Sequence, residues 1–215
     1  MSFRHRLPWL AALMVVLALG FTACSDEEGG DSRNIVDVIS LNGNEPLAAD
    51  VWEWIDDKDH SKGGYIPLEM VEVTFRSRAH DDALTIEPAE PFGSVRFTSF
   101  DVVFLDAAGT AGGADFDADG QIDLVNFSAP MNAVVPIGQT ATAGIQIVSF
   151  ENKATPPVAC LGPLEFLDYG ECTGVNAVEF AVSARITFHG VEETSGDKIT
   201  LTRGLYVTIA DLYSK

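Results

Sequence analysis

An alternating run of aspartates is the feature of this sequence best suited to chemistry. The aspartates stand at every second position, and a glycine and a further acid follow them: Asp115, Asp117, Asp119, Gly120 and Asp123. Carboxylates in such alternation can converge inside one tight turn, and glycine supplies the backbone freedom for the bend. Calcium is a hard cation that takes about six to eight oxygen ligands. The spacing therefore predicts a calcium loop whose ligands are Asp115, Asp117, Asp119, Asp123 and the backbone carbonyl of Gln121.

The motif resembles two families of calcium loop. Its first nine positions match the EF-hand loop, but Asn126 stands at the twelfth, where that family has a bidentate glutamate. The stretch DFDADGQIDLV is more similar to the calcium-binding hairpin loops of FG-GAP repeats in integrin-type propellers. A single copy implies no propeller, because blades come as repeats. The resemblance implies a structural ion, and we expect Ile122 to point inward and pin the loop to the core. Without the terminal glutamate, the affinity should be weak, with a Kd of ~10⁻⁴ to 10⁻³ M.

The alternative to a metal site is an acidic hairpin turn, because Asp and Gly are ordinary turn residues. Three alternating aspartates would repel one another without a cation, which favours the metal. A second acidic cluster, residues 56–60, lacks the glycine and contains Lys58, so we interpret it as a solvated loop. His60, His80 and His189 lie in separate segments, and we expect lone exposed histidines rather than ligands.

The sequence favours a binding or assembly module over an enzyme. It contains no G-x-S-x-G nucleophile elbow, no phosphate-cradling glycine loop and no HExxH zinc motif. Two alternatives stay open. A pair of carboxylates for glycoside hydrolysis is compatible with the many acids of the chain. Trp52 and Trp54 would form a carbohydrate-binding platform if both were exposed, whereas burial of both would place them in the core.

The first residues have the pattern of a secretory signal. A basic start with Arg4 and Arg6 precedes an apolar run of about 15 residues, shorter than the ~20 of a spanning helix. We expect a signal helix that is cleaved. Residues 21–24, Phe-Thr-Ala-Cys, resemble the lipobox of bacterial lipoproteins, which implies cleavage before Cys24 and a membrane anchor through lipid on Cys24. Ser25 after the cysteine implies, by the same resemblance, the outer membrane of a Gram-negative bacterium.

Composition separates three parts of the chain. Residues 1–23 form the predicted signal peptide, residues 24–34 the lipidated cysteine and a flexible acidic tether, and residues 35–215 one domain. The formal charge of the chain is −19, which argues against nucleic acid as a partner and is compatible with divalent cations. A partner of the exported domain would be a protein or a glycan.

Two cysteines remain after the lipobox, Cys160 and Cys172. Export would place them in an oxidising compartment, so a disulfide between them is the default expectation. Their spacing is too wide for a CxxC redox motif, and no histidine follows at the spacing of a zinc ligand. We predict a structural disulfide.

The elements that must position these residues are predicted from period-two alternation of apolar side chains, which is typical of half-buried antiparallel strands. The expected strands cover residues 35–41, 51–55, 71–76, 95–104, 122–127, 141–150, 178–188 and 199–209. The alternation changes phase at Thr98-Ser99, which predicts a β-bulge or a bend. No stretch after the signal has a convincing helical stripe. The pattern predicts an all-β, antiparallel two-sheet sandwich that resembles the immunoglobulin-like architecture, although the Cys…Trp…Cys signature is absent.

Overall fold

Alternating apolar side chains assemble two β-sheets in the computed structural model, which describes residues 34–80, 93–106, 108–117, 119–163, 172 and 177–212. These residues belong to one unit, residues 31–215. The predicted signal helix, Cys24 and nearly all of the acidic tether lie outside the described residues. The tether was predicted one residue too long, because Asn34 is buried and begins the first strand.

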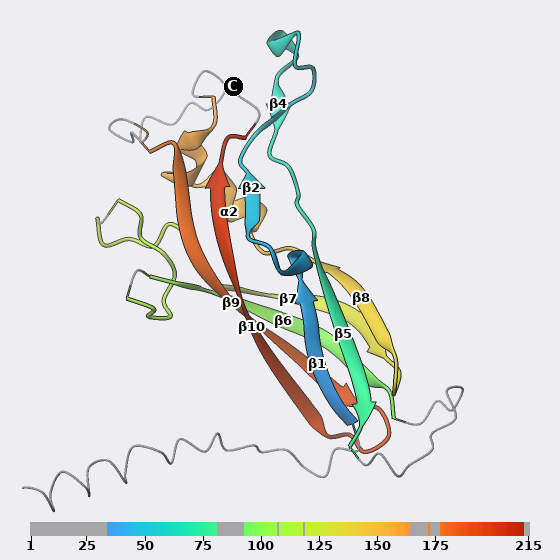
Figure 1. Cartoon of the computed structure of the whole chain (residues 1–215). Coiled ribbons are helices and arrows are strands. Elements are labelled where there is room, and N and C mark those ends of the chain that lie inside the picture. Colours follow the sequence, from blue (N-terminus) through green and yellow to red (C-terminus); the bar gives the residue numbers. More distant parts are fainter. Residues whose placement is uncertain are drawn as a thin grey trace, which may run out of the picture. The chain divides into compact units, whose positions relative to one another are not determined.

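The larger sheet has five strands in the order β2-β10-β9-β6-β7, and the smaller has three in the order β1-β5-β8 (Figure 1). The strands of the larger sheet are β2 (Leu47–Asp50), β10 (Lys198–Ala210), β9 (Glu179–Glu192), β6 (Val95–Leu105) and β7 (Phe127–Val135). Those of the smaller sheet are β1 (Asn34–Leu41), β5 (Val71–Ala79) and β8 (Thr140–Ile145). A separate short hairpin joins β3 (Glu53–Trp54) to β4 (Gly64–Tyr65). All pairings are antiparallel except β2 with β10.

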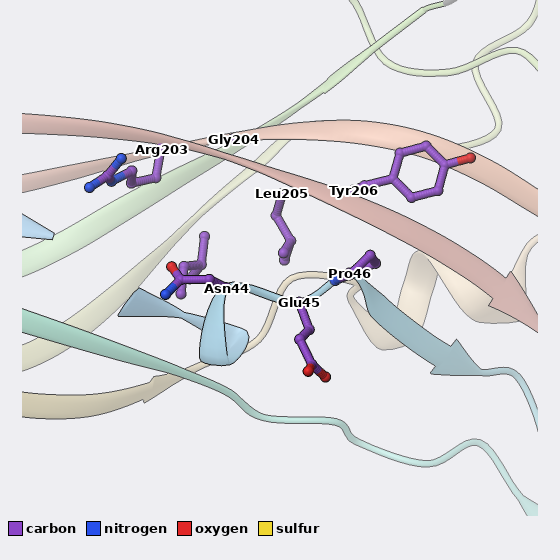
Figure 2. A pocket seen from close by; sticks show the side chains of 8 residues that line it. Asn44, Glu45, Pro46, Arg203, Gly204, Leu205 and Tyr206 are labelled. Atoms are coloured by element: carbon purple, nitrogen blue, oxygen red, sulfur yellow. The ribbon is translucent and has the colours of Figure 1, made fainter. Parts of the chain in front are cut away.

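The chain changes sheets between β1 and β2. β1 pairs with β5 in the smaller sheet, whereas β2 pairs with β10 in the larger one. The 3-10 turn η1 (Asn42–Asn44) makes the change with positive φ at Asn42, Gly43 and Asn44, a conformation that Asn and Gly tolerate best. The change of sheet leaves a groove of about 260 Å³ beside β10. Figure 2 shows that Leu205 points toward Asn44 and Glu45 in this groove.

The two sheets pack face to face through aromatic side chains. Phe75 of β5 stacks on Phe97 of β6, with ring centroids 4.4 Å apart, and meets Phe188 of β9 edge-on at 5.2 Å. All three rings are fully buried. Offset and edge-on contacts are the preferred geometries of aromatic pairs, so these rings stabilise the interface between the sheets. The predicted all-β sandwich is confirmed.

The phase change in β6 is a β-bulge, because the register of β6 shifts between Phe97 and Ser99 against both of its neighbours. The bulge keeps both halves of β6 facing the core, with Phe97 buried before it and Phe100 after it. The last two strands form a hairpin, since β9 and β10 pair antiparallel from Lys198 to Ala210.

Two strand predictions near the acidic loop were wrong. Residues 122–126 form no strand: Leu124 makes only an isolated bridge with Ala114, and β7 begins at Phe127. The strand expected over 141–150 ends at Ile145, and the short helix α2 (Phe150–Ala154) follows. A five-residue helix is too short to show an amphipathic stripe, so the alternation gave no sign of it.

The other elements in the described part of the chain are two further 3-10 turns, η2 (His60–Lys62) and η3 (Val158–Leu161). The strand expected over 51–55 was predicted too long, because only Glu53–Trp54 of that stretch is a strand, β3, and β2 already ends at Asp50. The predicted disulfide is confirmed and joins Cys160 of η3 to Cys172. Among the described residues, no helix has the length and apolarity to cross a membrane.

Candidate metal centre

The acidic loop, residues 115–123, lies between β6 and β7 and is closed at its base by backbone hydrogen bonds. The Ala114 carbonyl accepts from Asp123 N–H at 2.8 Å and from Leu124 N–H at 3.1 Å, while Ala114 N–H donates to the Leu124 carbonyl at 3.3 Å. Leu124 is fully buried in the core. The base of the loop is therefore fixed to the sandwich.

Phe116 and Leu124 anchor the loop, and Ile122 does not. Ile122 is 46% exposed, so the prediction that it points inward was wrong. Phe116 stacks on Phe180 of β9, with ring centroids 4.3 Å apart. Gly113 lets the two chain segments at the base of the loop approach each other, because a Cβ there would lie 2.3 Å from Cγ2 of Ile122. The contact with the core thus comes from Phe116, which follows Asp115, and not from Ile122 on the other side of the turn.

Three of the four predicted aspartates converge. Carboxylate oxygens of Asp115, Asp117 and Asp123 all lie within 4.8 Å of one another. Asp123 is only 6% exposed, and its Oδ2 accepts the Phe116 N–H at 2.5 Å. Oδ2 of Asp115 accepts the Gly120 N–H at 3.0 Å, and Gly120 has the positive φ of 89° that the predicted bend requires.

The fourth aspartate, Asp119, lies outside this group. Its Oδ1 accepts the backbone N–H of Gln121 at 2.7 Å, and its Oδ2 accepts Nε2 of Gln121 at 2.9 Å. Both oxygens of Asp119 are thus engaged within the turn. The group of converging carboxylates is therefore smaller than the predicted ligand set, and the two hydrogen bonds direct Asp119 toward Gln121.

The carboxylates of Asp115, Asp117 and Asp123 bring negative charge together at a site from which solvent is partly excluded. Burial is the main cause that raises the pKa of Asp123, and repulsion from Asp117, Asp115 and Asp119 adds to it, while the hydrogen bond from Phe116 opposes both. Among the described residues, no Lys, Arg or His forms an ion pair with Asp117, Asp119 or Asp123. A bound cation would relieve the repulsion and favour the charged form of Asp123.

A hollow of about 390 Å³ opens beside the triad. The acidic loop lines one side of it, and the segment after α2 lines the other with Thr155, Pro156 and Pro157. Asn126, at the twelfth position of the loop, forms a hydrogen bond with β6, because its Oδ1 accepts the Phe104 N–H at 2.8 Å. The acids therefore face an open volume that water or a ligand can enter.

The second acidic cluster fits the interpretation as a solvated loop. Lys62 forms an ion pair with Asp56, which lowers the pKa of Asp56, and Oδ1 of Asp56 accepts the Lys58 N–H at 3.0 Å. His60 is exposed and stacks on Trp54, with ring centroids 4.1 Å apart.

His189 is not the lone histidine that we expected. Its Nε2 lies 2.7 Å from Oδ2 of Asp101, and Oδ1 of Asp101 accepts the Ser128 hydroxyl at 2.5 Å. The hydrogen bond from Ser128, followed by that from His189, lowers the pKa of Asp101. The carboxylate stands between the other two groups, whereas a nucleophilic triad has the histidine in the middle. The cluster ties β6, β7 and β9 together on the outer face.

Trp52 and Trp54 are both buried, each 8% exposed, and they pack edge-on with ring centroids 5.9 Å apart. They form no exposed aromatic platform. The observation on which the carbohydrate-binding alternative depended is therefore missing, and the two rings belong to the core.

A buried ionic cluster next to the loop had no signal in the sequence. Lys153 of α2 is 1% exposed, and its Nζ donates to the carbonyls of Asp50 at 2.7 Å and Pro67 at 2.8 Å and forms an ion pair with Glu69. Burial is the main cause that lowers the pKa of Lys153, and Glu69 opposes it. Burial raises the pKa of Asp50, whose Oδ1 accepts the Leu212 N–H at 3.1 Å.

Comparison with known proteins assigns no family. No family model matches the chain, and no curated protein matches it. The solved structures include one X-ray structure of a Northeast Structural Genomics Consortium target that covers 82% of this chain and 87% of its own, with 10% identity and a TM-score of 0.33. A similarity at that score carries no inference about this chain.

Proposed function

We propose that the acidic loop binds one calcium ion that stabilises the sandwich. The observation that carries the proposal is the convergence of three carboxylates within 4.8 Å, one of them on the buried Asp123. Oxygens about 2.3–2.6 Å from one calcium ion must themselves lie within about 5 Å of each other. The hollow beside the triad leaves room for water molecules to complete the coordination.

The same convergence favours a cation over glycoside hydrolysis. Hydrolytic carboxylates stand on opposite sides of a substrate bond and need a sugar between them. Asp115, Asp117 and Asp123 come from one turn, and their oxygens surround a volume of atomic size. The loop would thus serve as a structural site in a domain that binds or assembles rather than one that catalyses.

We further propose that the whole protein is a lipoprotein of the bacterial cell envelope, anchored to the outer membrane through lipid on Cys24. The basic start, the short apolar run and the residues at 21–24 support this proposal. The disulfide between Cys160 and Cys172 is in keeping with an oxidising compartment. The anchored domain would bind or assemble with a protein or glycan partner.

Isothermal titration tests the calcium site. The soluble domain from Ser25 onward should bind about one calcium ion with a Kd of ~10⁻⁴ to 10⁻³ M. Asp123→Asn should abolish the binding heat, because it removes the buried carboxylate of the triad. Asp101→Asn is the matched control on the outer face and should bind like the wild type. A wild-type domain that gives no heat, or an unaffected Asp123→Asn variant, would contradict the proposal.

Membrane fractionation of cells that produce the full chain tests the anchor. Cys24→Ser should move the protein from the membrane fraction to the soluble fraction, because lipid can no longer be attached. Cys172→Ser serves as the control for loss of a cysteine elsewhere and should leave the fractionation unchanged. Membrane association of the Cys24→Ser variant would exclude lipid on Cys24 as the anchor.

A further inference from the structure

Helix α2 connects the acidic loop to the buried ionic cluster through two consecutive residues. Asn152, only 3% exposed, reaches the exit of the loop: its Oδ1 accepts the Val125 N–H at 2.9 Å, and its Nδ2 donates to the Val125 carbonyl at 3.1 Å. A single side chain thus satisfies both backbone groups of Val125, as a neighbouring strand would do. Val125 stands two residues after Asp123, so this contact holds the chain where it leaves the triad.

The next residue fixes the other side of the helix. The ammonium of Lys153 has three N–H donors, and it meets three acceptors: the carbonyls of Asp50 and Pro67 and the carboxylate of Glu69. A shift of α2 would break this set of buried charged contacts, which is costly. The N-terminus of α2 is also capped, since the Ser149 hydroxyl accepts the Asn152 N–H at 3.1 Å.

The chain that follows α2 completes the surroundings of the triad. Thr155 and the two prolines after it line the hollow opposite Asp117 and Asp123. One short segment therefore holds the exit of the loop on one side and forms the wall that faces the carboxylates.

We infer that Asn152 is the positioning residue of the acidic loop, with Lys153 as the anchor that keeps Asn152 in place. Asn152 touches backbone rather than the carboxylates, and it acts by fixing the exit of the loop at Val125. The spacing of the triad, and with it the affinity for calcium, would depend on this contact. The effect on calcium affinity rests on the proposed function, whereas the effect on the loop backbone does not.

The experiment compares the wild-type domain with Asn152→Ala in two measurements. Calcium titration should show affinity about tenfold weaker in the variant, the lower end of what loss of a group supporting metal ligands costs. Amide hydrogen exchange without metal should become faster at Val125, Leu124 and Asp123 together, since the whole exit is released. Asn132→Ala, an exposed asparagine on β7, is the matched control and should change neither measurement.

The two measurements separate the inference from the calcium proposal. If the wild type binds no calcium, the calcium proposal fails, and faster exchange at the three amides would still support the role of Asn152. Wild-type calcium affinity in Asn152→Ala would overturn the inference, and so would exchange that changes at Val125 alone. If Asn152→Ala does not fold, Asn152→Ser replaces it, because serine stays polar but is too short to reach both backbone groups of Val125.

Discussion

Two charged groups of residues lie on either side of α2, and they balance their charge in different ways. The ionic cluster of Lys153, Glu69 and Asp50 contains its own cation, with the Lys153 side chain fully buried. The acidic loop brings together Asp115, Asp117 and Asp123, two of them exposed, beside an open hollow. A cation from solvent can reach the loop, whereas the cluster receives its cation from the buried side chain of Lys153.

The directions of the pKa shifts express the same difference. In the ionic cluster, burial opposes the charge of Lys153, and the nearby carboxylate of Glu69 compensates. In the loop, burial and the neighbouring aspartates both oppose the charge of Asp123. Without an added cation, the loop therefore has no opposite charge to offset the cost of burial, whereas Glu69 offsets part of that cost in the cluster.

The largest expected effect is in the ionic cluster. Lys153→Met keeps most of the length of the side chain but leaves the buried Asp50 and the partly buried Glu69 without their cation. Breaking a buried ion pair in this way costs about 3–5 kcal/mol in the free energy of unfolding. Urea unfolding of the wild type and the variant measures the difference. A loss below about 1 kcal/mol would show that the cluster does not depend on an internal cation.

The matched control is an exposed ion pair on the larger sheet. Arg96 contacts Glu193 at 2.6 Å, with side chains 44% and 34% exposed. Arg96→Met should lower the free energy of unfolding by no more than about 1 kcal/mol, because solvent screens this pair. Equal losses in Arg96→Met and Lys153→Met would contradict the contrast between a buried and a solvated cation.

A smaller effect, with a characteristic pH dependence, is expected in the loop. Because the folded chain raises the pKa of Asp123, the folded state binds this proton more tightly than the unfolded state does. Metal-free wild type therefore loses stability as the pH rises through the folded pKa. Asp123→Asn removes that loss, so its stability relative to the wild type should increase between about pH 4 and pH 7. Urea unfolding in a chelator at several pH values measures the trend.

Asp101→Asn is the control with the opposite sign. The pKa of Asp101 is lowered, so its carboxylate stabilises the fold above the ordinary pKa of Asp, and this contribution is lost as the pH falls through the folded pKa. The stability of Asp101→Asn relative to the wild type should therefore decrease as the pH rises from the folded pKa to about pH 4. Trends of the same sign in the two variants would refute the account of the loop. Millimolar calcium should reverse the trend of Asp123→Asn alone.

Local patterns in the sequence predicted much of the sandwich. Alternation identified the buried faces of β5, β6, β9 and β10, and its change of phase at Thr98-Ser99 located the bulge. Cys160 and Cys172, the two cysteines that remain after the lipobox, were expected to pair, and they form a disulfide. These features are local because a strand presents every second side chain to one face, whatever the partner strand is.

The candidate site was predicted only in part. The spacing of the aspartates predicted Asp115, Asp117 and Asp123 as ligands. The hydrogen bonds between Asp119 and Gln121 had no such signal, because they depend on how the turn closes. The outward position of Ile122 had no signal in the alternation, because Phe116 takes the contact with Phe180 of β9 instead. Asn152 was missed, since its partner Val125 lies 27 residues away in a segment without regular structure.

The sequence by itself determined the class of fold, the disulfide and the place where carboxylates gather, because each follows from residue type and short spacing. Only the tertiary structure decided which carboxylates meet, that Trp52 and Trp54 are buried, and that a lysine supplies the cation for Glu69. Lys153 and Asp50 are 103 residues apart, and their contact exists only because α2 packs against the end of β2. Contacts of that separation come from the packing of whole elements, which no local pattern of side chains encodes.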